Sequence, residues 1–159
     1  TYDEASGQLK NRRSIVGHML KRLRLEDTTV RTIELMSKDS LEMDDADRAR
    51  IVEAVHVAGG SAQAPTDATG IVILHGTDTL ANTGDRLVRD IRQPRVPIVL
   101  AGAMRPYEMK QSDALQNLTE AIFAAGTLPP GVYCVAHGRA LKFPGVSKDR
   151  DRGTFIGGS

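Results

Sequence analysis

The feature that most constrains this chain is an alternation of short apolar runs with segments of helical spacing. Apolar residues fill positions 70–74 (GIVIL), 97–103 (PIVLAGA) and 131–136 (GVYCVA), a pattern typical of strands buried on both faces. The intervening residues 80–91 and 114–125 repeat apolar side chains at the three- and four-residue spacing of amphipathic helices. Strands that alternate with helices predict an α/β fold built on a doubly wound parallel sheet.

Further elements precede this alternation. Residues 14–23 and 44–57 have helical spacing, and Asp44 or Asp45 is suited to cap the second of these helices. The β-branched run at 30–35 (VRTIEL) predicts a fourth strand.

Two expectations concern the C-terminal half. Residues 138–159 follow neither period, so we expect an irregular tail there. In the last predicted helix, we expect the buried face to consist of Leu115, Leu118, Ile122 and Phe123.

Composition narrows the class of protein. The 159 residues suit one domain, residues 1–159. Lys and Arg number 21 against 20 Asp and Glu, a balance that argues against a nucleic-acid or anionic membrane surface. The single cysteine, Cys134, cannot form an internal disulfide and fits a reducing compartment. These observations predict a soluble, cytoplasmic globular protein.

The ends of the predicted strands are the expected place for a site. In an open α/β sheet, ligands bind outside the carboxyl ends of the strands. The loops selected by this rule contain Ser37–Ser40, His75–Thr79 and Gly102–Pro106. The second loop reads HGTDT, and its threonines and aspartate suit either a helix N-cap or a site, because a helix follows immediately.

The familiar cofactor motifs do not occur in the sequence. It contains neither a G-x-G-x-x-G after a strand nor a phosphate-binding G-x-x-x-x-G-K-[ST], and no His/Cys pair has metal-ligand spacing. A G-x-S-x-G nucleophile turn does not occur either. We therefore predict no cofactor and no metal. Of the four dispersed histidines, His75 lies beside the candidate site, where we expect it to shape the loop.

Taken together, HGTDTLANT, PIVLAGAMRP and SDALQNLTEA, followed by GVYCVAHGRA and VSKDRDRGTF, resemble the bacterial-type L-asparaginase family in its short, single-domain form. The resemblance implies a flavodoxin-like sheet and the conversion of L-asparagine to L-aspartate and ammonia, with some action on L-glutamine. It also implies that no cofactor is needed and that the protein is a homo-oligomer.

The resemblance assigns a Thr-Lys-Asp group. Thr77 and Asp78 match the family's HGTDT directly, and Lys148 in GVSKDR is the best match for its lysine, with Lys142 as the competitor. A threonine hydroxyl needs a base to take its proton. A lysine can be that base only when burial keeps it neutral, whereas a carboxylate such as Asp78 favours its charged form. The alternative is a charged lysine that orients groups and shuttles protons.

The same resemblance assigns the substrate contacts. KDSLEM looks like the loop that binds the amino-acid end of the substrate, which implicates Asp39 and Ser40. Ala103 in GAMRP would lend its backbone to the substrate amide. Tyr2 falls where short members carry the tyrosine that assists the nucleophile.

One family signature does not occur in the sequence. The primary nucleophilic threonine of the family lies in T-G-G-T-I, at the end of the first strand, whereas this chain opens with TYDEASGQLK. We expect about 15–20 residues carrying that strand to precede Thr1 in the natural protein, from typical strand and loop lengths. Two alternatives to an asparaginase stay open: an amidotransferase subunit that releases ammonia for glutamyl-tRNA, and a catalytically silent ligand-binding domain.

Overall fold

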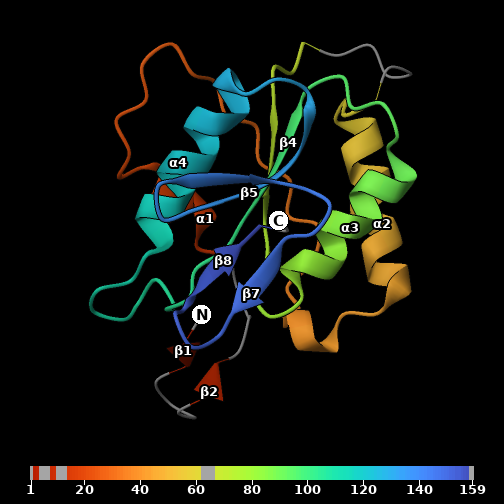
Figure 1. The fold of residues 1–159 in the computed structure, drawn as a ribbon. Coiled ribbons are helices and arrows are strands. Elements are labelled where there is room, and N and C mark those ends of the chain that lie inside the picture. The colour runs from red at the N-terminus through yellow and green to blue at the C-terminus, as the bar shows by residue number, and fades with distance from the viewer. Residues whose placement is uncertain (1, 4–7, 10–13, 62–66, 158–159) are drawn as a thin grey trace.

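The computed structural model describes residues 2–3, 8–9, 14–61 and 67–157 (Figure 1). Each predicted helix is present among them, although the first is shortened to five residues. Among these described helices, none is long and apolar enough to cross a membrane. The helices are α1 (Val16–Leu20), α2 (Asp45–Val57), α3 (Leu80–Asp90) and α4 (Ala114–Thr127), with one 3₁₀ turn, η1 (Ser40–Glu42).

Four strands of the described chain form the main sheet, in the order β3–β4–β5–β6. The first three run parallel, which confirms the predicted α/β sheet, and β6 adds an antiparallel edge that makes the sheet mixed. Leu74 pairs with Ala101, so β3 and β4 end side by side. The strands are β3 (Ile71–Leu74), β4 (Pro97–Ala101), β5 (Gly131–Ala136) and β6 (Arg139–Lys142).

Helices cover both faces of this sheet. Figure 1 shows α4 on one side of the strands and α2 with α3 on the other. Along β4, Ile98 and Leu100 pack in a core cluster with residues of α2 and α3, whereas Val99 and Ala101 pack with alanines of α4. Every residue of β4 is buried. A strand with a helix layer on each face needs apolar side chains on both, which explains the continuous apolar run in the sequence.

The prediction that β3 is buried on both faces is wrong. Ile71, Val72 and Ile73 are only partly buried, and Leu74 is 40% exposed. Within the described part of the chain, β3 pairs with β4 alone and forms the edge of the sheet. An apolar run indicates that a strand tends to be buried. Whether the strand is in fact covered depends on neighbours from elsewhere in the sequence, which the run itself does not specify.

The predicted strand at 30–35 is also wrong, because no ladder is formed there by any described residue. This segment lies beside α2, where Arg50 Nη2 donates a hydrogen bond to the carbonyl of Leu35 at 3.1 Å. Ile33 is 68% exposed. β-branched residues favour extended backbone, but a strand also requires a partner at ladder distance.

The tail predicted as irregular contains β6 and a small antiparallel sheet, so that prediction is wrong. β7 (Ser147–Asp149) pairs with β8 (Thr154–Ile156). Phe143, Val146 and Phe155 anchor this region in the core cluster shared with α2 and α3. Each of these strands has at most four residues, too few for an alternating pattern to be recognised in a charged stretch.

Two details of the helices refine the predictions. Asp44, rather than Asp45, is the N-cap of α2, and it forms a reciprocal capping box with Asp47. Phe123 of α4 is 72% exposed, so its placement in the buried face is wrong. The sheet-facing surface of α4 is formed by small residues instead: Ala121, Ala124 and Ala125.

Candidate active site

The candidate site begins in the turn that joins β3 to α3. Thr77 is 7% exposed, and Asp78 is half-buried beside it. The next turn along the sheet edge packs closely against this one, since a Cβ on Gly102 would lie 2.3 Å from the carbonyl oxygen of His75. The parallel pairing of β3 with β4 therefore brings two of the predicted loops into contact.

Lys148 reaches this turn from β7. Its Nζ donates to Thr77 Oγ1 at 2.7 Å and to Asp78 Oδ1 at 3.0 Å. About 70 residues separate the lysine from its two partners in the chain, and its side chain is 17% exposed. Lys142, the competing assignment, lies exposed on β6. The structure thus brings together the three residues that the resemblance grouped.

The charges of this cluster favour an ionised Asp78. The hydrogen bond from Lys148 holds the pKa of Asp78 below its ordinary value of 3.8, and the positive charges of Lys148 and Arg150 act in the same direction. Arg150 Nη1 lies 2.9 Å from Asp78 Oδ1. Arg150 was not singled out from the sequence, where it belongs to the charge run KDRDR; its position two residues after Lys148 is the signal that could have found it.

The two hydroxyls around Asp78 do not serve the following helix. The N-cap of α3 is Thr79, and the structure gives it no side-chain capping bond. Thr79 Oγ1 donates instead to the carbonyl of Ser40 at 2.8 Å. Thr77 Oγ1 accepts from Lys148. The threonines of HGTDT therefore bind other segments of the chain and do not cap α3.

Asp39 and Ser40 lie against this same turn. Ser40 is buried, and a Cβ on Gly76 would lie only 2.5 Å from its hydroxyl oxygen. Asp39 is exposed, and its carboxylate accepts from the backbone amide of Leu41 at 2.9 Å, which caps η1. The predicted substrate loop therefore packs onto the turn that carries Thr77.

Ala103 is half-buried in the turn after β4, and the two backbone amides that follow it are held by one carboxylate. The amides of Met104 and Arg105 each donate to Asp113 at 3.0 Å. Burial raises the pKa of Asp113, but these amides and a hydrogen bond with His137 outweigh it and hold the pKa below 3.8. Asp113 directly precedes α4, where an aspartate often caps a helix, but the structure gives it no side-chain capping bond.

The other predicted residues are placed less fully. Tyr2 belongs to β1 (Tyr2–Asp3), which pairs with β2 (Gln8–Leu9), but its side chain lies outside the described part of the structure. His75 is buried, with Nδ1 2.8 Å from the carbonyl of Gly76 and Nε2 2.8 Å from Thr83 Oγ1. Both contacts are local, as expected for a residue that shapes the loop, and burial lowers its pKa below 6.5.

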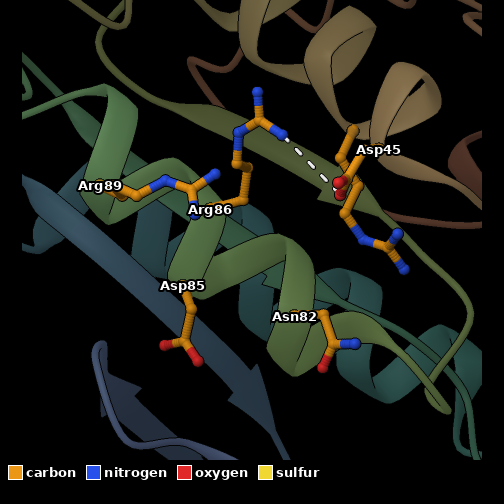
Figure 2. A pocket seen from close by; sticks show the side chains of 6 residues that line it. Asp45, Asn82, Asp85, Arg86 and Arg89 are labelled. Carbon is orange, nitrogen blue, oxygen red and sulfur yellow. Dashed lines mark ion pairs between the residues drawn. The ribbon is translucent and has the colours of Figure 1, made fainter.

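A separate hollow of about 320 Å³ lies between α2 and α3. Figure 2 shows Arg86 directed toward Asp45, with which it forms an ion pair at 4.0 Å. Among the described residues, no three His, Cys, Asp or Glu side chains come together as metal ligands. The hollow shares no lining residue with the cluster around Lys148; its lining comprises Asp45, Arg48, Asn82, Asp85, Arg86 and Arg89.

Comparison with known proteins matches this chain to one family. The family model described as "Asparaginase, N-terminal" covers residues 2–152. The L-asparaginase of Thermococcus kodakarensis is 36% identical over 127 residues, which make up 79% of this chain and 37% of that protein. A solved structure titled "The thermostable L-asparaginase from Thermococcus kodakarensis" superposes with a TM-score of 0.79 at 32% identity, over 88% of this chain and 42% of the other.

A second group of relatives carries another name. A glutamyl-tRNA(Gln) amidotransferase subunit of Thermoplasma acidophilum is 36% identical over 99 residues, or 62% of this chain and 23% of that protein. The subunit of the same name from Methanococcus vannielii is 45% identical over 71 residues, or 45% and 16%. The chain thus spans less than half of the length of each of these relatives.

Proposed function

Because the chain belongs to the asparaginase family, we propose that the cluster of Thr77, Asp78 and Lys148 is part of an amide-hydrolysing site that acts on L-asparagine. The observation that carries this proposal is the position of Lys148 Nζ, within hydrogen-bonding distance of both Thr77 and Asp78 at the carboxyl end of a parallel strand. In the reaction, water would supply the oxygen of a new C–O bond while the C–N bond of the side-chain amide breaks, which yields L-aspartate and ammonia.

In this proposal Lys148 orients Thr77 and passes a proton through the threonine hydroxyl to the departing amide nitrogen, and the water that attacks the amide carbon returns a proton to the lysine. Its Nζ donates to the threonine oxygen, which leaves the hydroxyl hydrogen of Thr77 free to point toward a reacting group. Asp78 Oδ1 lies 3.0 Å from Lys148 Nζ and forms an ion pair with it, which fixes the direction of the lysine side chain. General acid–base groups placed in this way contribute about 10²–10⁴-fold to rate.

The substrate contacts follow from the packing around this cluster. We propose that Asp39 and Ser40 bind the amino-acid end of asparagine, because their segment packs on the turn of Thr77. The backbone at Ala103 would polarise the amide carbonyl, since its turn lies against the same loop. Tyr2 is proposed to assist the nucleophile on the strength of the family resemblance alone.

The motif T-G-G-T-I, which carries the family's nucleophilic threonine, does not occur in the 159 residues. We therefore expect this polypeptide to bind L-asparagine but to release ammonia very slowly. A fusion that places a strand bearing T-G-G-T-I ahead of Thr1, here called the TGGTI fusion, is expected to release ammonia faster. Turnover of the unfused chain at the rate of a full L-asparaginase would contradict this division of the site.

The test measures ammonia release from L-asparagine and from L-glutamine by the 159-residue chain and by the TGGTI fusion. Thr77→Ala in the fusion is expected to abolish release, while calorimetry still detects asparagine binding. A matched control is Thr119→Ala, whose hydroxyl donates to the carbonyl of Leu115 on the exposed side of α4. Binding of asparagine without ammonia release from either protein would favour a catalytically silent ligand-binding domain.

A second candidate function is that of an amidotransferase subunit that releases ammonia for glutamyl-tRNA amidation. It is supported by the identity to the two amidotransferase subunits named above, and it predicts partner subunits rather than a homo-oligomer. Ammonia release that depends on L-glutamine and on an added partner subunit would favour this candidate. Release from L-asparagine by the fusion alone would favour the asparaginase.

We also propose that the protein works in a reducing, cytoplasmic compartment as a homo-oligomer. The basis for the compartment is Cys134, which is the chain's single cysteine and is buried within β5. Burial raises the pKa of its thiol to about 12, so the group is unreactive there. The homo-oligomer rests on the family resemblance, and its mass by light scattering would test it.

A further inference from the structure

We propose that Asp113 and His137 are positioning residues that hold the turn around Ala103 and the strand carrying Lys148 in a fixed relation. They would act through the backbone and through β8, without touching substrate. This role rests on the proposed function, because it concerns the same site. The contacts themselves are independent of any activity and can be tested without it.

At one end, Asp113 and Asn117 together fix the backbone on both sides of Ala103. Asp113 Oδ1 accepts from the amide of Arg105 and Oδ2 from the amide of Met104, each at 3.0 Å. Asn117 Nδ2 lies 2.8 Å from Asp113 Oδ2 and also donates to the carbonyl of Gly102 at 2.8 Å. Backbone groups held by buried partners have few alternative conformations, so this turn is prepared to present its backbone to a ligand.

At the other end, His137 connects that carboxylate to the sheet of β7 and β8. Its Nε2 lies 2.9 Å from Asp113 Oδ2, and its Nδ1 lies 3.0 Å from the hydroxyl of Thr154 in β8. Thr154 is 7% exposed and pairs across the ladder with Asp149, the residue after Lys148. A displacement of β8 would therefore be passed to β7 and to the lysine.

The backbone at His137 offers an independent reason to assign its side chain a role. Residues His137 and Gly138 form the two-residue turn between β5 and β6, and both have positive φ, at 53° and 75°. Turns of this kind are formed most often by Asn-Gly, and a positive φ is uncommon for any residue other than glycine. The amide of His137 donates to Asn117 Oδ1 at 3.1 Å, so this conformation is tied to α4.

The hydrogen bonds of this connection form a chain with one direction. The ionised carboxylate of Asp113 can only accept, so Nε2 of His137 carries a proton. Thr154 can then donate its hydroxyl hydrogen to Nδ1 while it accepts from Arg139 Nη2 at 2.9 Å. Each of these groups has a hydrogen-bond partner, and such networks make the segments that they join more rigid.

The test follows the accessibility of Lys148 to acetylation by an N-hydroxysuccinimide ester under native conditions, with mass spectrometry of each lysine. In His137→Asn, which keeps a residue suited to the turn, we expect Lys148 to react about fivefold faster, the factor for losing one hydrogen bond of ordinary net strength. Lys38 is an internal reference, because it is also partly buried and paired, with Asp47 at 2.5 Å. Its partner belongs to α2, which lies on the opposite side of the sheet from α4 (Figure 1).

Two further variants complete the design. Thr154→Val removes the same connection with nearly unchanged side-chain volume. It is expected to increase the acetylation rate of Lys148 by a similar factor, and it can be measured even if His137→Asn does not fold. His56→Asn is the matched control, since His56 Nδ1 on α2 also contacts a hydroxyl, that of Ser61 at 2.8 Å. It is expected to leave the reactivity of Lys148 unchanged.

Faster acetylation of Lys148 with unchanged Lys38 would support the proposal. An unchanged rate at Lys148 in both variants, or an equal increase at both lysines, would overturn it, because the latter indicates general loosening of the fold. Absence of ammonia release from the TGGTI fusion would refute the proposed function but leave the acetylation result standing. The two failures can therefore be told apart.

Discussion

Asp78 and Asp113 each lie between the end of a parallel strand and the start of a helix, and the two strands are neighbours in the sheet. Each position is one where an aspartate often caps the helix, yet the described structure gives neither carboxylate that role. Asp78 binds the side-chain cations of Lys148 and Arg150, whereas Asp113 binds two backbone amides, an amide side chain and an imidazole.

The difference separates a carboxylate that binds side-chain cations from one that binds backbone amides. The side chain of Asp78 is 28% exposed and its partners are long side chains, so its contacts can rearrange when a ligand binds. The side chain of Asp113 is 14% exposed and its contacts are fixed by the fold. Similar positions in a doubly wound sheet can thus hold long side chains in one case and backbone in the other.

Removal of the two carboxylates should affect stability very differently. Asp113→Ala leaves four hydrogen-bond donors without their acceptor, so we expect the free energy of unfolding to fall by about 2–4 kcal/mol. Asp78→Ala should lower it by less than about 1 kcal/mol, because solvent can replace the carboxylate around its cations. Urea denaturation followed by circular dichroism measures both, and equal losses would contradict the distinction.

A smaller loss of stability is expected when the segment of Asp39 and Ser40 is pushed away from the turn that carries Asp78. In Gly76→Ala the new Cβ would lie 2.5 Å from Ser40 Oγ and 2.7 Å from its Cβ. We expect a loss of about 1–3 kcal/mol in the free energy of unfolding together with weaker asparagine binding. Gly126→Ala is the control, since its Cβ meets nothing within 4 Å on α4 and should raise stability by about 0.5–1 kcal/mol. Equal effects of the two substitutions would show that the contact with Ser40 is unimportant.

Salt should distinguish the two carboxylates by their pKa. Both have a pKa below 3.8 in the folded protein, so each stabilises the fold above that pH and loses this contribution as pH falls through its folded value. At about 1 M salt the screening length is about 3 Å, so the pKa of Asp78, lowered by cations, should rise. The pKa of Asp113, lowered by backbone amides, should change little. Carboxyl carbon NMR titrations at low and high salt measure this, and equal shifts would contradict the contrast.

The smallest effect is expected at Arg150. Its side chain is 67% exposed, and its pair with Asp78 is worth less than about 0.5 kcal/mol of unfolding free energy. Arg150→Ala should raise the pKa of Asp78 slightly, because one of the two cations is lost. The same NMR titration checks this result. A large change in the free energy of unfolding would show that Arg150 stabilises the fold by more than its charge.

Local pattern was sufficient for part of this architecture. The helices and the three parallel strands could be predicted because their apolar spacing is local to each segment. Residues 30–35 have the same strand-forming character as residues 71–74, but a ladder needs a partner strand, and nothing within VRTIEL specifies one. The exposure of Leu74 was missed for the same reason.

The candidate site could be predicted from the sequence where its side chains belong to a recognisable motif. HGTDT identified Thr77 and Asp78, and only the family resemblance favoured Lys148 over Lys142, because a lysine in a charge run is otherwise expected to be solvated. The partners of Asp113 could not be predicted. Two of them are backbone amides in a turn, and backbone geometry leaves little trace in residue type.

We propose above all that Lys148, which donates hydrogen bonds to Thr77 and Asp78, is required for amide hydrolysis. Its most direct test measures ammonia release from L-asparagine by the TGGTI fusion and by two variants of that fusion. One variant carries Lys148→Met, and the matched control carries Lys142→Met, which removes an exposed lysine from β6. We predict that Lys148→Met lowers kcat by about 10²–10⁴-fold and that Lys142→Met leaves it unchanged. Retained turnover in Lys148→Met, or an equal loss in Lys142→Met, would contradict the assignment.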